Sequence, residues 1–235
     1  MARVHKINTM KIDILQTATR LFFEKGYSKA TAAALCKEME IGTGNLTFYF
    51  PTKEHILAVL VEMLCDFQWR LIEESTDEGK NSLLAYCMEL AARTAISEEN
   101  EQIRDLFISS YQHSLTLEII RASGVEKIKR VFKDFCVGWS EEQFVEAAAI
   151  VSGIEYATLM TTKHSASLPV RIAGALESIM LIFGVPKDLR RTKMAKTLNM
   201  DYKSIGRKIL DDFKQFVEQT NQNALEELLS SIKRN

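Results

Sequence analysis

The side chains most able to perform catalysis or bind metals, cysteine and histidine, are scattered along the chain. No Cys-x-x-Cys pair occurs among the four cysteines, which are Cys36, Cys65, Cys87 and Cys136. No metal-ligand spacing relates the four histidines, which are His5, His55, His113 and His164. The sequence offers no Gly-rich phosphate loop and no recognisable Ser-His-Asp or Cys-His arrangement. We therefore expect no enzyme activity, no metal and no cofactor, and reduced, mostly buried thiols.

Positive charge is concentrated at the start of the chain. Residues 1–60 contain eight Lys or Arg and five Asp or Glu, a net charge of +3, whereas the remaining residues contain 22 and 26, a net charge of −4. A basic head on an acidic body favours binding of a polyanion by the head. The alternative is a chance distribution, because the excess amounts to only three charges.

Few helix-breaking residues interrupt the chain, which has three prolines and ten glycines in 235 residues. This composition favours long helices over many short strands. Within 10–25, apolar residues recur three or four positions apart and predict a helix with one buried face, formed by Ile14, Ala18, Leu21 and Phe22. Gly26 follows at the position of a C-capping glycine.

Two short helices come next, predicted at 31–39 and 44–50 with a tight break between them. Pro51 ends the second, because a residue before proline avoids the α conformation, and a longer helix is predicted at 53–74. Two short helices joined by a turn of three or four residues form a helix-turn-helix, whose second helix fits the major groove of DNA. The free N–H groups of its first turn suit phosphate oxygens.

Residues 14–57 resemble the DNA-binding domain of the TetR (tetracycline-repressor) family. The matching pieces are Ile14-Leu15-x-x-Ala18-x-x-Leu21-Phe22-x-x-Lys25-Gly26-Tyr27, Thr31-x-x-x-Leu35, Ile41-x-x-Gly44-Asn45-Leu46 and Tyr49-Phe50-Pro51-Thr52-Lys53-Glu54-x-Ile56-Leu57. They occur in order and without gaps, and the Phe-Pro-Thr-Lys-Glu ending is the most specific of them. The resemblance implies an all-α, dimeric transcription regulator, most often a repressor, that binds operator DNA.

The resemblance also implies roles for single residues. Thr31 and Lys53, each at the start of a helix, would contact phosphates, and Tyr49 would reach the DNA backbone. The head of the recognition helix would face the groove with Thr43, Gly44 and Asn45. Among these, Gly44 permits close approach of the two backbones.

Three positions depart from the usual pattern of the family. Thr47 stands where the family usually has Tyr, and its methyl group could meet a thymine methyl. Glu40 replaces the usual turn glycine, so a positive φ there would cost about 1 kcal/mol, and its charge opposes DNA. Gly42 stands where Ser is frequent. These changes leave the predicted fold intact and alter affinity and operator sequence.

The aromatic run of the recognition helix has two interpretations. It could be only the hydrophobic core of a small three-helix unit, and for Leu46 and Phe50 we favour that role. For Phe48 and Tyr49 we favour contact with DNA at the surface.

The rest of the chain is also predicted to be helical, so the fold class is all-α. We expect a helix-turn-helix domain at 1–57 and a larger effector-binding and dimerisation domain at 58–235. The expected helices of the body are 81–97, 99–114, 115–136 with an interruption near Gly124, 140–163, 168–183, 187–199 and 202–233. No run of 18 apolar residues and no signal-peptide core occurs, which favours a cytoplasmic protein without membrane contact.

A homodimer is expected through helices near 144–160 and 170–183, which combine small residues with large apolar ones. The first contains Ala147-Ala148-Ala149, Ser152-Gly153 and Ala157, and the second contains Ala173-Gly174-Ala175, Leu176, Ile179, Met180 and Phe183. The alternative is that these residues belong to the internal core. A two-fold dimer would bind a pseudo-palindromic operator.

The site of a small apolar or aromatic effector is left open by the sequence. The residues that could line a pocket, and for which a role in the core is the stronger alternative, are Trp69, Met88, Phe107, Tyr111, Phe132, Trp139 and Met160. A regulator controlled by a protein partner and a helical scaffold that only dimerises are further alternatives. The role of 186–235 is undecided between a dimer arm and a partner surface.

Overall fold

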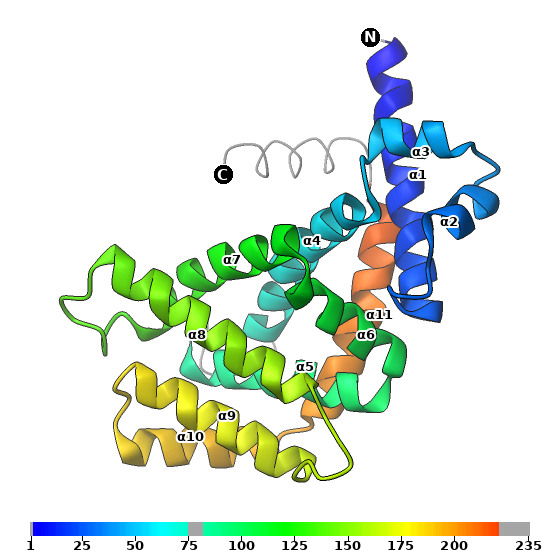
Figure 1. Cartoon of the computed structure of the whole chain (residues 1–235). Helices are drawn as coiled ribbons and strands as arrows, with labels where there is room; N and C mark the ends of the chain where they lie inside the picture. The colour runs from blue at the N-terminus through cyan, green and yellow to red at the C-terminus, as the bar shows by residue number, and fades with distance from the viewer. Residues whose placement is uncertain (1, 75–81, 221–235) are drawn as a thin grey trace.

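The computed structural model describes residues 2–74 and 82–220, which form eleven α-helices and no strand (Figure 1). The all-α fold class is therefore confirmed. In chain order the helices are α1 (Ala2–Lys25), α2 (Ala32–Glu38), α3 (Thr43–Tyr49), α4 (Lys53–Glu74), α5 (Leu83–Glu99), α6 (Glu101–Gln112), α7 (Ser114–Phe132), α8 (Glu141–Leu159), α9 (Leu168–Ile182), α10 (Lys187–Asn199) and α11 (Tyr202–Gln219).

The predicted helices agree with the observed ones to within about four residues at their ends, apart from two larger corrections. The first helix begins at Ala2 and not near residue 10, because no proline or glycine stands between them to stop it. The interruption expected near Gly124 is wrong, since α7 runs through it. A Cβ on Gly124 would lie 3.9 Å from the Ala148 Cβ, so α7 and α8 pack closely there. The part of the last predicted helix beyond residue 220 lies outside the described residues.

The first three helices form a head at one end of the molecule (Figure 1). Its core contains the apolar face predicted for the first helix, with Ile14, Ala18, Leu21 and Phe22 at 1% exposure or less. Gly26 ends α1 with a φ of +83°, as a C-capping glycine does. The boundary predicted at 57/58 falls inside α4, which runs unbroken from the head into the body.

Buried side chains form two groups. One fills the head and continues onto α4, α6 and α11, with members such as Leu35, Leu57, Phe107 and Phe213. The other lies between α5 and α7–α10, and its buried members include Phe132, Ile172 and Phe183. The head therefore shares its core with the body.

The last described helix, α11, connects the two ends of this shared core. At its start, Gly206 packs so tightly on α5 that an added Cβ would lie 2.7 Å from the Ala92 carbonyl oxygen. Farther along, the Phe213 ring lies 6.2 Å from that of Phe23 in α1 and 5.6 Å from that of Phe67 in α4. The Gln16 amide of α1 donates to two carbonyl oxygens near the end of α11, at 2.9 and 3.2 Å. The C-terminal segment thus supports the head, a role that the sequence left undecided.

Among residues 2–74 and 82–220, no helix combines the length and the apolar character that crossing a membrane requires.

We predict that Gly206→Ala destabilises the protein by about 1–3 kcal/mol, because the added methyl group would collide with backbone that cannot move aside. The matched change Gly124→Ala meets only an ordinary contact, so its better helix propensity should raise stability by about 0.5–1 kcal/mol. Urea unfolding of both variants measures the difference. Equal effects of the two substitutions would show that α11 does not depend on this close approach to α5.

Candidate nucleic-acid interface and the cavity behind it

The two short helices of the head meet in a tight turn built on Glu40. The Ile41 N–H donates to the Cys36 carbonyl and the Glu40 N–H to the Lys37 carbonyl, at 3.0 and 3.3 Å, which is the pattern of a Schellman motif. Glu40 occupies its left-handed position with a φ of +54°, and no other non-glycine residue of the described chain has a positive φ. The positive φ considered for this position in the sequence is therefore observed.

The third helix presents its leading end to solvent and its other side to the core. Thr43, Gly44, Asn45 and Thr47 are exposed. Leu46 and Phe50 are buried, at 4% and 5% exposure, and Ile41 packs against the same core. This confirms that the helix is held from one side and free on the other.

The two aromatic residues between these core positions differ from each other. The Phe48 ring is 66% exposed, and it meets the half-buried Tyr49 ring edge to face at 5.1 Å. Phe48 is thus a surface residue, as we favoured, whereas Tyr49 also packs against the core of the head. The exposed Phe48 ring leaves apolar surface open to contact with another molecule.

Hydroxyl groups near the interface have defined partners. Thr31 caps α2, where its Oγ1 accepts from the Ala34 N–H at 3.1 Å and keeps its own proton for another acceptor. Thr47 Oγ1 instead donates to the carbonyls of Thr43 and Gly44, at 3.1 and 3.2 Å. Because its proton is used within the helix, Thr47 has only its methyl group and its oxygen lone pairs left for contacts outside the helix.

Lys53 is folded back onto the loop after α1. Its ammonium group donates to the Tyr27 carbonyl at 2.8 Å and lies 3.8 Å from the centre of the Tyr27 ring. Burial lowers the pKa of Lys53, and the carboxylates of Asp105 and Glu54 offset part of that effect. Lys53 therefore holds the head to α4, and only its remaining N–H bonds are available to a phosphate.

The same loop is anchored to α6. Ser28 donates to the Asp105 carboxylate with its backbone N–H and with its hydroxyl, at 2.8 and 2.6 Å. His113, just after α6, lies 3.1 Å from the Glu54 carboxylate and stacks edge to face on Tyr27. Burial first, then Glu54 and Asp105, raise the pKa of Tyr27 to about 12. The head therefore contacts the body through polar as well as apolar groups.

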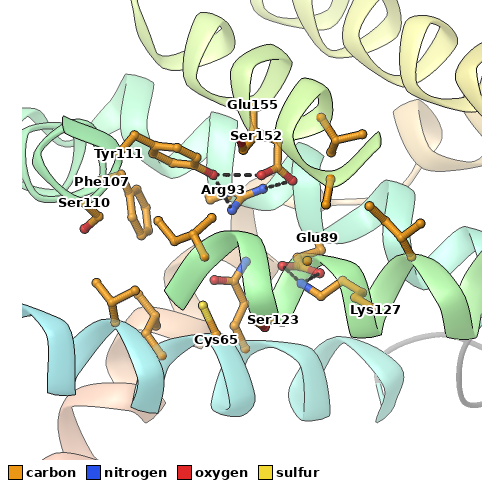
Figure 2. A pocket seen from close by; sticks show the side chains of 18 of the residues that line it. Cys65, Glu89, Arg93, Phe107, Ser110, Tyr111, Ser123, Lys127, Ser152 and Glu155 are labelled. Atoms are coloured by element: carbon orange, nitrogen blue, oxygen red, sulfur yellow. Dashed lines mark hydrogen bonds and ion pairs between the residues drawn. The ribbon is translucent and has the colours of Figure 1, made fainter. Parts of the chain in front are cut away.

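A cavity lies in the body between α4, α5, α6, α7 and α8 (Figure 2). Its clear central space is about 60 Å³, and the whole hollow with its opening measures about 700 Å³. Two ion pairs cross it. Lys127 binds both oxygens of Glu89 at 2.6 and 2.7 Å, and Arg93 binds Glu155 at 2.6 Å.

Tyr111 completes the second pair. Its hydroxyl donates to the free oxygen of Glu155 at 2.9 Å and accepts from Arg93 at 3.1 Å (Figure 2). Burial by itself lowers the pKa of Arg93, but Glu155 and then Tyr111 and Glu89 outweigh it and raise that pKa. Burial also raises the pKa of the Cys65 thiol on the cavity wall to about 11, so this cysteine is a thiol and not a nucleophilic thiolate.

Of the seven residues that the sequence offered as pocket lining, Phe107 and Tyr111 line the cavity. Trp69, Met88 and Phe132 are buried in the core, Trp139 packs against Phe183, and Met160 is half exposed. The charged lining residues were missed, because each ion pair joins α5, which carries Glu89 and Arg93, to a distant helix. Lys127 lies in α7 and Glu155 in α8, and only the fold brings them to their partners. The local sequence signal for these residues is a charged side chain within an otherwise apolar helix, as for Glu89 and Arg93 in α5.

The helices expected to dimerise present an uncovered face, but not through all the residues expected. Leu176, Ile179, Met180 and Phe183 are at most 1% exposed, so these four belong to the internal core. The exposed apolar side chains are instead Val145, Ile150, Val170 and Leu181, each about half exposed. Gly153 and Gly174 lie on the same faces of α8 and α9, with open space where a Cβ would stand.

The exposed leading end of α3, its buried opposite side and its turn from α2 define a helix-turn-helix protein. Residues 14–60 match the family model described as "Bacterial regulatory proteins, tetR family". The "Uncharacterized HTH-type transcriptional regulator YuxN" of Bacillus subtilis (strain 168) is 31% identical over 77 residues, which are 33% of this chain and 26% of the relative. Residues 14–60 therefore match the DNA-binding domain of the TetR family. The match spans only about a quarter of the length of the Bacillus relative.

Two solved structures are similar at lower identity. One, "Crystal structure of gamma-butyrolactone receptor (ArpA like protein)", has a TM-score of 0.42 at 16% identity and covers 89% of this chain and 99% of its own. The other is that of Mycobacterium smegmatis AmtR, with a TM-score of 0.34 at 17% identity, covering 80% of this chain and 93% of its own.

We predict that Glu40→Gly raises the free energy of unfolding by about 1 kcal/mol, because glycine adopts the left-handed conformation without a Cβ penalty. Glu40→Ala is the matched control, since it removes the same charge and keeps the strain. Urea unfolding should show a gain for glycine only. An equal gain for alanine would assign the effect to the carboxylate and not to the backbone.

Proposed function

We propose that this protein is a DNA-binding transcription regulator, a repressor whose α3 enters the major groove of an operator. The observation that carries the proposal is that α3 is buried on one side only. Leu46 and the capping residue Phe50 are buried behind an exposed polar tip. No charged residue occurs in α3, so this helix can read base edges while basic residues elsewhere in the head supply attraction to phosphates. No catalytic role is proposed for any residue.

The contacts follow from these positions. Thr43, Gly44 and Asn45 would meet base edges and the nearby backbone, and Thr47 would place its methyl group in the groove. Phe48 and Tyr49 would pack against the sugar-phosphate backbone beside the groove. Thr31 would donate its free hydroxyl proton to a phosphate, and Lys53 would reach one with the N–H bonds that Tyr27 leaves free. The domain division at 57/58 is retained as a functional one, with α4 common to both parts.

A homodimer through α8 and α9 accounts for their uncovered faces. Val145, Ile150, Val170 and Leu181 form apolar contact points around glycines that let two helices approach closely. A two-fold axis through this face would place two copies of α3 on one duplex, which matches an operator with two related half-sites. We place this regulator in the cytoplasm.

The cavity supports control by a small molecule in preference to a protein partner. A connection of three residues separates α3 from α4, and α4 lines the cavity with Val61, Leu64 and Cys65. A molecule that widens the cavity would displace α4. Because α4 follows α3 directly, this movement would change the distance between the two α3 helices of the dimer. Since two spacings cannot both match one operator, binding would change affinity for DNA.

The proposal is tested by selecting binding sequences from random duplexes and from fragments upstream of the gene of this chain. We expect enrichment of one inverted repeat. Gly44→Ala should weaken binding to it about tenfold or more, because the methyl group would stand between two backbones. Nothing within the protein opposes that methyl group, so the same variant should unfold no more easily than the natural chain. Selection without any enriched sequence would overturn the proposal.

Dimerisation is tested with two matched substitutions of exposed apolar residues. Ile150→Asp should shift the protein to monomers in sedimentation velocity, since it places charges face to face in the proposed interface. Phe48→Asp should remain dimeric and lose DNA binding, because it introduces negative charge beside the phosphates. A dimeric Ile150→Asp variant would contradict the assignment of α8 to the interface.

A further inference from the structure

One tyrosine on the cavity wall has a hydroxyl group without a partner. Tyr86, in α5, is 4% exposed, and its Oη is buried with no hydrogen bond. Among the described residues that line this cavity, only Tyr86 has a buried polar atom without a partner. Native proteins rarely keep such a group unsatisfied, because burial removes its water without replacing the hydrogen bond. An absent molecule that accepts this proton would explain it.

The proton is available for donation. Burial first, and then the carboxylates of Glu155 and Glu89, raise the pKa of Tyr86, so the hydroxyl stays protonated at neutral pH. Both carboxylates are already engaged by other groups, Glu89 by Lys127 and Glu155 by Arg93 and Tyr111. The Tyr86 hydroxyl is therefore left as an unpartnered donor on a residue that lines the cavity.

The charges of the lining limit what can enter. Two acidic and two basic side chains are paired within the cavity, so their sum is zero. All four are at most 14% exposed. A charged molecule would add an unpaired charge to a buried place or break one of these pairs, and both are costly. An uncharged molecule avoids this cost.

The remaining lining is mostly aliphatic or aromatic, with Leu64, Phe107, Ile120, Ile128 and Val151 among its members. Such a wall favours a molecule that is apolar over most of its surface. The clear central space of about 60 Å³ requires a compact molecule and some outward movement of the wall.

From the unpartnered Tyr86 hydroxyl and the balanced charges, we propose that the effector is a small, uncharged, largely apolar carbonyl compound whose oxygen accepts a hydrogen bond from Tyr86. This inference rests on the proposed function of the cavity as an effector site. It commits to the carbonyl class because that oxygen accepts without bringing a donor that would need a second partner.

The test uses three molecules of one shape and different charge: cyclohexanone, cyclohexanecarboxylate and cyclohexylammonium. Binding to the full chain is measured without DNA, by calorimetry and by the shift of the melting temperature. We expect the ketone to bind at least about tenfold more tightly than either ion. Tyr86→Phe should weaken binding of the ketone about three- to tenfold.

Stability separates this role from a structural one. Removing the Tyr86 hydroxyl should leave the melting temperature of the empty protein unchanged or higher, because that group has no partner to lose. Tyr111→Phe is the control, since its hydroxyl bonds Glu155 and Arg93 and its loss should lower the melting temperature.

Three results would overturn the inference: an ion that binds as tightly as the ketone, equal ketone affinity in the natural chain and Tyr86→Phe, or no binding of any of the three. Operator binding by the same preparation distinguishes the two proposals. If the preparation binds its operator and gives any of these results, only the carbonyl compound is rejected. If the preparation shows no sequence-specific DNA binding, the proposed function itself is rejected.

Discussion

The position of the recognition helix depends on apolar packing between the head and two helices of the body. Phe213 of α11 is 1% exposed and lies between Phe23 of α1 and Phe67 of α4. A close-packed core resists small displacements of single side chains, so the head is carried as a unit with α4, α6 and α11. The direction in which α3 points is therefore decided far from α3 itself. The hydrogen bonds that join the loop at Tyr27 to α4 and α6 are directional, so they also fix the orientation of the head relative to the body.

The cavity of the body lies beside this apolar core, at the place where two buried ion pairs occur among apolar side chains. Both ion pairs are formed by side chains from α5, α7 and α8, and they lie in the otherwise mostly apolar lining of this hollow. The wall of the hollow includes α4, which continues directly from the head, and Leu64 and Phe107 belong both to that wall and to the shared core. A change inside the cavity is thus one packing layer away from the helices that hold α3.

Much of the head could be predicted because its signals are local. The spacing of Ile14, Ala18 and Leu21, the capping position of Gly26 and the stop at Pro51 each act within a few residues, and the structure agrees with them. The same holds for Leu46 and Phe50, which alternate with exposed neighbours. Prediction was weaker for α9, where apolar residues surround most of the helix and spacing cannot tell an internal face from an external one. Leu176 and Met180 were therefore assigned to the wrong side.

By itself, the sequence determined which segments are helical, the stops at Gly26 and Pro51 and the helix-turn-helix, since hydrogen bonds within a helix, capping residues and proline stops involve near neighbours only. Tertiary structure alone decided the partners of Arg93 and Lys127, the burial of the Tyr86 hydroxyl without a partner and the support of α1 by α11. Each of these depends on which distant helices meet and at what distance. That outcome is set by the packing of the whole chain, and no local pattern of residue types encodes it.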